Sequence, residues 1–416
     1  MGDWWVSLFT GLFLFRYLRF VVNCIGYFCY RPAKAPTGRR KFSNKDVSVI
    51  LPTIDPTGPD FQECIRTCAQ NSPKAIFVVT TAGERFETTK KIVEPFRKEF
   101  PSTKFKVLES EIANKRRQVA VAIPHVKTAL TLMLDDHVFW GPHFLQSAVL
   151  PFEDDTVGLV GTNKMARRVP NLGLTARFFN MLGCLYLTRH NFEIRATNAI
   201  DGGVFVISAR TCIIRTRIIT DQQFLDGYKN EMFFFGKYGP LNPDDDNFLT
   251  RYVVRQGWRI KVQYTPEACI ETTVGIAQPI VTKFLGQCLR WARTTWRSNA
   301  CSLFTDRSIW SFQPWCVYAV FLSSFTNFAF FVDGGLMGLL LKSSLGSLRF
   351  FGVPTPYLLM MWILFTKLVK VLPYFWQYPQ DLPFFIGYLG FAYYHSYIKV
   401  KSLFTFWDCQ WTGRNL

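Results

Sequence analysis

Long apolar runs lie near both ends of this 416-residue chain, and the section between them alternates short apolar runs with polar segments. The long runs cover residues 4–30, 312–341 and 353–372, and each is long enough for a helix across a bilayer core, which needs about 20 apolar residues. Arg16 and Arg19 interrupt the first run, and an arginine at mid-membrane costs about 2.5–3.5 kcal/mol. The first run therefore predicts either a tilted spanning helix, whose arginines snorkel or face other parts of the protein, or a helix that lies in the membrane interface.

The middle section, residues 46–275, predicts a soluble α/β domain. We expect strands over 46–53, 75–81, 104–109 and 129–137, separated by helices at about 60–71, 87–100 and 115–123. Strands that alternate with helices in this way form a parallel sheet covered by helices on both faces. Ligands of such sheets bind at the carboxyl ends of the strands.

The strand expected over 129–137 ends in Asp135, Asp136 and His137. Carboxylates and an imidazole at one strand end can hold a divalent cation, and such a cation can clamp a diphosphate leaving group. A polar loop start with a capping aspartate explains the same residues. Residues 115–118, KRRQ, place cations at the start of a helical pattern, where an anion is favoured, although a solvated basic face explains them equally well.

The stretch NPDDDNFLT, residues 242–250, crowds three carboxylates into a basic chain. Asn242 can cap a helix and Pro243 fits its first position, so that Asp244 and Asp245 form an acidic first turn. Asp246 lies one step further in, where like charges or partial burial would raise its pKa toward that of a useful general base. The helix dipole opposes that rise, so both interpretations stay open.

The stretch QCLRW places Gln287, Arg290 and Trp291 on one face of a helix that we expect over about 279–298. Arginine can neutralise phosphate, glutamine can form hydrogen bonds, and tryptophan offers a flat surface for a sugar ring. The same helix is amphipathic, which is typical of a helix on a membrane surface. These two interpretations are compatible.

The stretch NAIDGGVFVIS, residues 198–208, reads as a Gly-Gly turn that enters a strand. Because Asp201 is followed by Gly202 and Gly203, a ligand or a second backbone could approach closely there. A plain turn explains the same pattern.

The chain carries 48 Lys plus Arg against 30 Asp plus Glu. The basic residues are spread along the whole chain without a nucleic-acid-binding motif, so we expect no nucleic acid partner and assign the charge to lipid headgroups and anionic substrates. The linker RPAKAPTGRRK, residues 31–41, is typical of the cytosolic side of a membrane helix. The eleven cysteines include no CxxC pair, which indicates reduced thiols.

Seven motifs follow one another in a recognisable order: VSVILPTID, NKRRQVA, LMLDDH, DGGVFVIS, PDDDNFLTR, QCLRW and, at residues 411–414, WTGR. Together they resemble membrane-embedded family-2 glycosyltransferases, such as hyaluronan, chitin and cellulose synthases, and their pattern is most similar to fungal type-2 glycosyltransferases. The resemblance covers roughly residues 46–300 and the C-terminal tip. It implies a Rossmann-like GT-A catalytic domain flanked by transmembrane and interfacial helices.

The resemblance also implies a donor site for a UDP-sugar. Thr53 and Asp55 would lie near the nucleotide, and Lys115 near its diphosphate. Asp135 and His137 occupy the outer positions of the family's DxD metal motif and would bind Mn²⁺ or Mg²⁺. Because the family usually has aspartate where His137 stands, the choice between His137 and Asp136 as the ligand stays open.

The remaining motifs imply a general base, further contacts to the diphosphate, an acceptor site and a C-terminal element that contacts the donor. Asp246 matches the general base, and Asp245 is its acidic neighbour. Gln287 and Arg290 would bind the diphosphate, while Trp291 would stack on the acceptor sugar, with Asp201 and Gly202 close to it. Trp411 and Arg414 resemble a WGTR element that contacts the nucleotide sugar, although the order here is WTGR.

These observations predict six parts, with two C-terminal spans at about 313–341 and 353–372 that return the WTGR element to the cytosol. The parts are an N-terminal transmembrane helix (1–30), a basic linker (31–45), a cytosolic catalytic domain (46–275), an interfacial helix (276–303), transmembrane helices (304–382), and an interfacial helix with the WTGR element (383–416).

The expected function is inverting sugar transfer from a UDP-sugar to a growing polysaccharide at the plasma membrane, coupled to translocation of the polymer across it. So few helices predict either a narrow tilted pore or a homo-oligomer. Two alternatives stay open: transfer of one sugar to a membrane lipid such as ceramide or a polyprenyl phosphate, and a membrane scaffold without catalytic activity.

Overall fold

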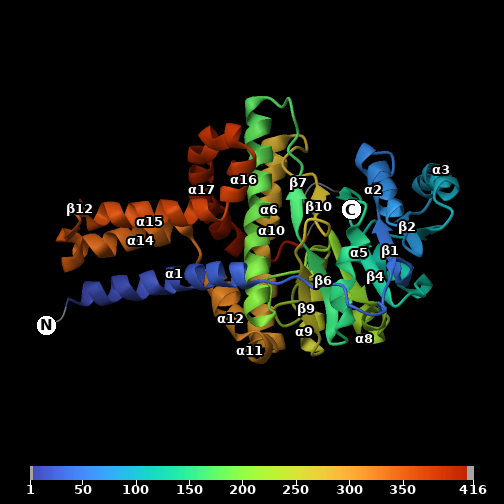
Figure 1. Ribbon diagram of the computed structural model, residues 1–416, viewed down its shortest axis with the longest axis horizontal. Coiled ribbons are helices and arrows are strands. Elements are labelled where there is room, and N and C mark those ends of the chain that lie inside the picture. Colours follow the sequence, from blue (N-terminus) through green and yellow to red (C-terminus); the bar gives the residue numbers. More distant parts are fainter. Residues whose placement is uncertain (1–2, 410–416) are drawn as a thin grey trace.

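The computed structural model describes residues 3–409, and its centre is a seven-stranded sheet (Figure 1). The strand order is β3-β2-β1-β4-β8-β6-β9. The strands are β1 (Val47–Pro52), β2 (Ala75–Thr81), β3 (Lys104–Ser110), β4 (Leu130–Leu134), β6 (Val157–Thr162), β8 (Thr211–Arg215) and β9 (Arg259–Gln263). The four predicted strands are confirmed, and they are parallel to one another. Only β8 runs antiparallel to both of its neighbours.

The position of β1 determines where the sheet opens for a ligand. β1 pairs with β2 on one side and with β4 on the other, so the strand order reverses there and leaves a crevice at the carboxyl ends of β1 and β4. Every residue of β1 and β4 is buried, because the helices α2 (Pro59–Gln70), α3 (Glu84–Glu99) and α4 (Lys115–Ala122) cover this half of the sheet. Burial on both faces explains their continuous apolar sequences.

A small sheet extends the domain beside this crevice. It contains β5 (Val138–Trp140), β10 (Ile270–Thr272) and β7 (Lys164–Ala166), in that order. β10 is antiparallel to β5 and parallel to β7. The small sheet brings Lys164, on β7, to the same side of the domain as Asp135 and His137, which precede β5.

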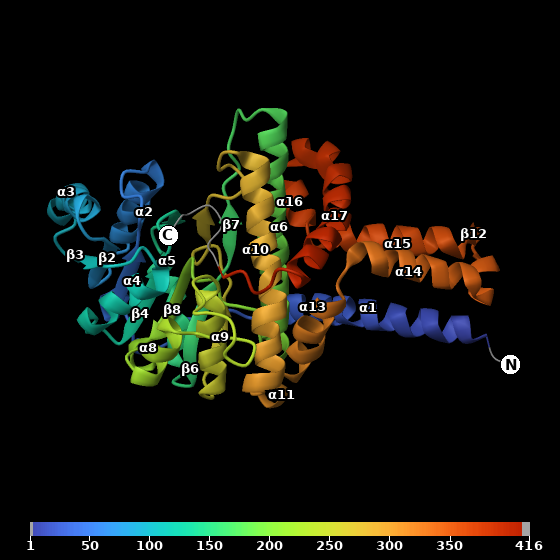
Figure 2. The ribbon, with the colours of Figure 1, turned by 180° about the vertical axis from the view of Figure 1, so that it is seen from behind.

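Two long helices, α6 (Leu174–Asp201) and α10 (Ile280–Ala300), lie side by side along one flank of the sheet domain (Figures 1 and 2). α10 confirms the helix predicted for the QCLRW stretch. The 28-residue helix α6 was not anticipated. Asp201 ends α6, Gly202 follows in a left-handed conformation (φ 77°), and the next strand begins only at Thr211. The predicted Gly-Gly turn into a strand is therefore wrong.

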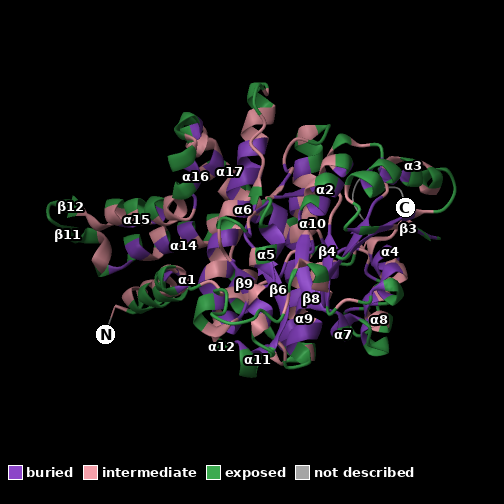
Figure 3. Ribbon diagram, turned by 45° about the vertical axis from the view of Figure 1, so that its right-hand side comes forward, coloured by how far each residue is buried: buried purple, intermediate pink, exposed green. Residues whose placement is uncertain are grey.

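Three apolar helices project from this flank away from the sheet: α1 (Trp4–Cys29), α14 (Ala329–Lys342) and α15 (Thr355–Val369) (Figure 1). Within residues 3–409, α1 is the one unbroken helix that is long and apolar enough to cross a membrane. Much of its surface is exposed (Figure 3). α15 has 15 residues and is shorter than that.

The chain before α14 does not form the straight helix expected over 313–341. The helical segments Pro314–Thr326 and Ala329–Lys342 meet at 90°. Polar side chains surround this break: Arg16 Nη1 donates to Asn327 Oδ1 at 2.5 Å, and the Lys399 ammonium donates to the carbonyls of Ser324 and Asn327. Backbone groups freed by a broken helix need such partners in an apolar environment.

The two arginines of α1 face other helices. Arg16 lies 3.8 Å from Asp333 of α14, and Arg19 Nη1 donates to the carbonyl of Ala319 and to Ser323 Oγ. Asp333 also forms an ion pair of 2.7 Å with Lys367 of α15. Of the arrangements considered for α1, this favours protein-facing arginines.

The C-terminal part returns to the sheet domain through α16 (Leu372–Gln377) and α17 (Phe385–Leu403), and α17 packs along α10. The helix predicted over 383–404 is thus confirmed as a helix. Trp411 and Arg414 lie outside the described residues.

Candidate active site

A cavity of about 410 Å³ lies at the carboxyl end of β4, between the start of α4, the start of α9 (Asp245–Arg255) and the inner face of α10. This volume is typical of small-molecule sites. Eight of the residues singled out from the sequence line it: Lys115, Asp135, His137, Asp245, Asp246, Gln287, Arg290 and Trp291. Four separate motifs therefore meet in one pocket.

Lys115 is held between two carboxylates at one end of the cavity. Its Nζ lies 2.7 Å from Asp135 Oδ1 and 3.0 Å from Asp245 Oδ2. Burial by itself lowers the pKa of Lys115, but Asp135 and Asp245 hold that pKa well above its ordinary value. Burial likewise opposes ionisation of Asp135, and the Lys115 charge more than offsets it, so the pKa of Asp135 is lowered. Both groups are charged at neutral pH.

Asp136 and His137 stand beside this ion pair. Thr53 Oγ1 donates to Asp136 Oδ2 at 2.8 Å, and His137 Nδ1 lies 3.1 Å from Asp136 Oδ1. Asp135 and His137 line the cavity, whereas Asp136 is held by its neighbours. Gln118, on α4, donates to the carbonyl of Thr53 at 3.0 Å and fixes the end of β1.

The donor set at the end of β4 fits a divalent cation. Among residues 3–409 no three His, Cys, Asp or Glu side chains converge as a complete metal cage. Mg²⁺ commonly takes only one or two carboxylates from the protein and completes its shell with water and substrate phosphates. Asp135, with His137 or Asp136, supplies that number and kind of ligand.

The three aspartates lie at the start of α9, but the helix begins later than the sequence suggested. Asp244 is the N-cap residue, in a left-handed conformation (φ 62°), and Asp245 is the first helical residue. The prediction that Asn242 caps this helix is therefore wrong. The sharp turn at Asp244 brings all three aspartates to the cavity wall.

The sequence left the direction of the Asp246 pKa shift open, and in the structure the pKa is raised. Burial, and then the charges of Asp245 and Asp244, raise the pKa of Asp246 to about 6, while Lys115 and Arg290 oppose the rise. Its Oδ1 accepts hydrogen bonds from the backbone N of Asn247 at 2.9 Å and from Asn247 Nδ2 at 3.1 Å. A carboxylate with this pKa is ionised at neutral pH and can still accept a proton.

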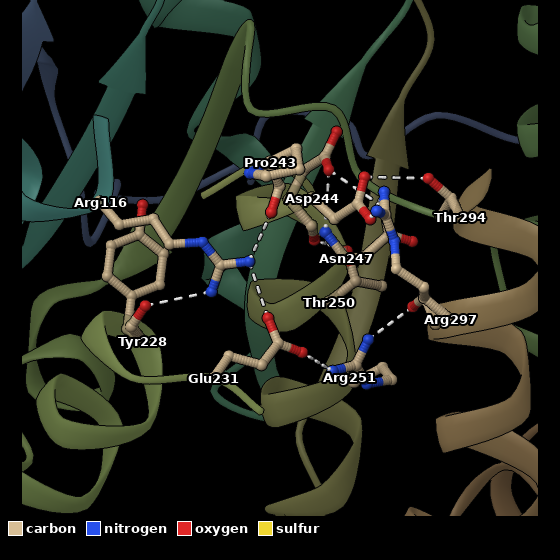
Figure 4. A network of polar contacts seen from close by, with 12 residues as sticks. Arg116, Tyr228, Glu231, Pro243, Asp244, Asn247, Thr250, Arg251, Thr294 and Arg297 are labelled. Carbon is tan, nitrogen blue, oxygen red and sulfur yellow. Dashed lines mark hydrogen bonds and ion pairs between the residues drawn. The ribbon is translucent and has the colours of Figure 1, made fainter. Parts of the chain in front are cut away.

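Buried arginines fix the turn that carries these aspartates (Figure 4). Arg116, only 1% exposed, donates to the carbonyl of Pro243 at 2.8 Å and to Glu231 Oε2 at 2.7 Å. The other oxygen of Glu231 accepts from Arg251 of α9. One guanidinium therefore joins α4 to both the chain before the turn and, through Glu231, the helix after it.

Asp244 is held from α10. Thr294 Oγ1 donates to Asp244 Oδ1 at 2.9 Å, and Arg297 Nη2 lies 2.6 Å from Asp244 Oδ2 (Figure 4). Arg297 also donates to the carbonyl of Asp408 at 3.0 Å. The C-terminal segment, α10 and the aspartate turn are thus linked through one buried side chain.

The α10 face of the cavity carries an aromatic platform. The rings of Trp291 and Tyr186 lie 4.6 Å apart between centroids, and the Arg210 guanidinium lies 5.6 Å from the Trp291 centroid. Gln287 and Arg290 line the same face. A sugar ring could lie against Trp291 while Arg290 meets a phosphate.

Among the described residues, five that the sequence singled out do not line the cavity: Thr53, Asp55, Asp136, Asp201 and Gly202. Thr53 is buried and holds Asp136, and Asp55 is exposed at the end of β1. Asp201 accepts hydrogen bonds from the backbone N of Gly203 at 2.9 Å and of Cys316 at 3.0 Å. Asp201 and Gly202 therefore brace the end of α6 against the chain at Cys316, and the structure does not bring them to the predicted acceptor site.

Four further residues line the cavity without belonging to a motif that the sequence suggested: Lys164, Tyr186, His190 and Arg210. They come from β7, from α6 and from the segment before β8. The only sequence signal was a charged residue beside an apolar run, as in VGLVGTNK (157–164).

Comparisons with known proteins identify the family and the fold of this chain. Residues 46–294 match the sequence family described as glycosyltransferase-like family 2. A type 2 glycosyltransferase of Gibberella zeae is 37% identical over 420 residues, covering 99% of this chain and 76% of that protein. One of Zymoseptoria tritici is 37% identical over 412 residues, covering 99% and 84%.

A solved structure shares the fold. It is a mannosyltransferase of Pyrobaculum calidifontis in complex with GDP-mannose and Mn²⁺, with a TM-score of 0.54 at 15% identity, covering 96% of this chain and 99% of that one. The fold is accordingly the mixed α/β glycosyltransferase fold that the motifs predicted. With a family match over more than half of its length and close fungal relatives, the chain belongs to glycosyltransferase family 2.

Proposed function

We propose that this chain is an inverting glycosyltransferase that moves a sugar from a UDP-sugar to the end of a growing polysaccharide at a membrane. One observation carries the proposal: a single cavity holds Lys115 with Asp135 at one end, Asp246 at its wall and Trp291 on its α10 face. The sugar donor, the base Asp246 and an acceptor that lies on Trp291 can then meet at one reacting carbon.

Departure of UDP requires that the growing negative charge on its diphosphate be neutralised. Lys115, held charged by its carboxylate partners, and Arg290 face the cavity where the diphosphate would lie. Asp135, with His137 or Asp136, would hold Mn²⁺ or Mg²⁺. When bound, such a cation stabilises the leaving diphosphate as a Lewis acid.

The acceptor hydroxyl must lose its proton as it attacks. Asp246 Oδ1 already accepts two hydrogen bonds from Asn247, which leaves Oδ2 to take the proton. Trp291 would orient the acceptor ring toward that atom. A single displacement at the anomeric carbon inverts its configuration, so an α-linked donor gives a β-linked product without a covalent enzyme intermediate.

The projecting helices support a membrane location, which we propose is the plasma membrane with the catalytic domain in the cytosol. α1 has the length and composition of a membrane span, and the basic residues 31–41 follow it directly. α10 runs across the base of the projecting helices (Figure 2), as a helix on the membrane surface would. An acceptor at that surface can reach the cavity from the α10 side.

Transfer of one sugar to a membrane lipid is the second candidate. Its support is the small number of spans, because within residues 3–409 only α1 and one sharply bent pair pass the length and composition test. So few spans favour an acceptor that stays in the membrane. Translocation of a polymer would need a narrow tilted pore or a second copy of the chain.

The deciding experiment incubates the full-length protein with UDP-sugars and GDP-mannose, and measures nucleotide release and product length. We expect UDP release with one UDP-sugar and a product of many residues. Radiolabel found only in a chloroform-soluble glycolipid would replace the polymer by the lipid acceptor. Release of GDP in place of UDP would overturn the proposed donor.

A further inference from the structure

The cavity has a second cationic wall besides the Lys115 ion pair, and the two adjoin where the backbone N of Asp135 donates to the carbonyl of Arg210 at 3.0 Å. Lys164 of β7, His190 of α6 and Arg210 before β8 all line it. Among residues 3–409, neither Lys164 nor Arg210 forms an ion pair with a carboxylate, and the buried Nε2 of His190 has no hydrogen-bond partner. Three elements of the fold therefore bring donors together without supplying an acceptor for them.

A comparison of Lys115 with Lys164 shows how unusual a buried lysine without a carboxylate partner is within this cavity. Lys115 lies between two carboxylates, which compensates for its burial. Lys164 is only 3% exposed. Burial, and then the charge of Arg210, lower the pKa of Lys164 to about 7, while the charge of Asp246 opposes this shift. Burial together with Lys164 and Arg210 also holds the pKa of His190 well below its ordinary value. A buried cation without a counter-ion is costly, and an anion from solution would supply the counter-ion.

We infer that Lys164, Arg210 and His190 form a subsite for an acidic group, a carboxylate or a phosphate, on the acceptor. This inference rests on the proposed function and names the class of its acceptor. Lys164 and Arg210 would form charge-assisted hydrogen bonds to the anion, and neutral His190 would donate one more from Nε2.

The position of Arg210 assigns this subsite to the acceptor. The Arg210 guanidinium lies over Trp291, the proposed platform for the acceptor ring. The donor diphosphate has binding groups of its own, Lys115 and Arg290, together with the residues that would hold a divalent cation. Asp246 lies close enough to influence both Lys164 and Arg210. An acidic group in the subsite would therefore hold a sugar acceptor with its hydroxyl near the base, whereas a phosphate acceptor would attack the anomeric carbon with one of its own oxygens as UDP leaves.

Anion binding should be coupled to proton uptake by Lys164. The charged groups around Lys164 are Arg210 and Asp246, beside neutral His190. With free Lys164 titrating at about 7, a bound carboxylate raises its pKa. Affinity for a carboxylate ligand is then greatest below pH 7 and falls as pH rises through the higher pKa of the complex.

The test uses the full-length protein in phosphatidylcholine nanodiscs, its UDP-sugar donor, and three acceptors that share an octyl chain: octyl glucoside, octyl glucuronide and octyl phosphate. We expect kcat/KM for UDP release to be at least about tenfold higher with one or both anionic acceptors than with the glucoside. Preference for the glucuronide indicates an acidic glycan, and preference for the phosphate indicates a lipid phosphate. Equal values for all three acceptors would overturn the inference and leave the proposed function standing. Absence of transfer to any acceptor from any donor would overturn both.

Variants test which residues carry the preference. In Lys164→Met the ratio of kcat/KM for the anionic acceptor to kcat/KM for octyl glucoside should fall to about two or less, while the Kd for UDP is unchanged. Lys91→Met, which removes a lysine from α3 at the far edge of the sheet, is the matched control and should keep the full preference. If Lys164→Met weakens UDP binding as strongly as it reduces the preference for anionic acceptors, the cationic wall belongs to the donor site and the inference is overturned. If that variant does not fold, Arg210→Gln serves under the same criteria.

Discussion

Removing Arg297 should strand a buried negative charge beside the proposed base. Arg297 is 2% exposed, its Nη2 lies 2.6 Å from Asp244 Oδ2, and its Nη1 donates to the carbonyl of Asp408 at 3.0 Å. In Arg297→Met the methionine fills much of the volume but removes the ion pair of Asp244, which keeps its hydrogen bond from Thr294. Breaking a buried ion pair on one side costs about 3–5 kcal/mol. We expect the free energy of unfolding to fall by that amount.

Arg297→Met should also change the pH dependence of sugar transfer. Asp244 is one of the charges that raise the pKa of Asp246. Without Arg297 the charge of Asp244 is less well compensated, so the pKa of Asp246 rises further and the acid limb of the kcat/KM profile moves to higher pH. The double variant Arg297→Met/Asp244→Asn removes the stranded charge and should recover both part of the stability and the lower acid limb.

The assays are urea unfolding of the four members of this cycle and kcat/KM between about pH 5 and 9. A coupling energy of at least about 2 kcal/mol between Arg297 and Asp244 is expected, since contacting residues in one network commonly couple by 0.5–3 kcal/mol. Additive effects within about 0.5 kcal/mol, or an acid limb that does not move, would refute the reasoning that Arg297 compensates Asp244.

Three further predictions follow from the same cavity. In the wild type, activity should rise as pH increases through about 6, the pKa of Asp246, and Asp245→Asn should shift this limb to lower pH; a limb near pH 4 in the wild type would contradict the role of burial. His137→Ala should weaken Mn²⁺ binding, so that UDP release needs a higher Mn²⁺ concentration in a metal titration; an unchanged titration would assign the ligand to Asp136. Trp291→Ala should raise the acceptor KM by about tenfold while the Kd for UDP stays the same; a parallel loss of UDP affinity would argue against an acceptor platform.

Elements whose signal is local could be predicted from the sequence. β1, β2, β3 and β4 are short apolar runs buried on both faces, and the alternation with α2, α3 and α4 determined their parallel order. The motifs that meet in the cavity could also be found, because each places charged or aromatic groups at a strand end or on one helix face. Their convergence follows from the sheet topology.

Elements whose position depends on distant contacts could not be predicted. α6 has no strong one-sided apolar pattern, and its partners are α1, β7 and α10. The 90° break before α14 depends on Arg16 and Lys399, which lie far away in the sequence.

The cationic wall of the cavity has the same origin. Lys164, His190 and Arg210 are separated by more than 40 residues in sequence between first and last, and only the packing of β7 against α6 brings them together. The cap of α9 fell on Asp244 in place of Asn242 because Arg297 and Thr294, from α10, hold that carboxylate. The N-capping preference of asparagine alone favours Asn242.

The most direct test of the account is sugar transfer by Asp246→Asn. The amide keeps the shape of the side chain but cannot take the proton of the acceptor, so the rate of transfer should fall by about 10²–10⁴-fold, the usual contribution of general base catalysis. Binding of UDP, measured by calorimetry on the same preparation, should be unchanged or slightly tighter. Transfer within a few-fold of the wild-type rate, with UDP still bound, would contradict the assignment of Asp246 as the base.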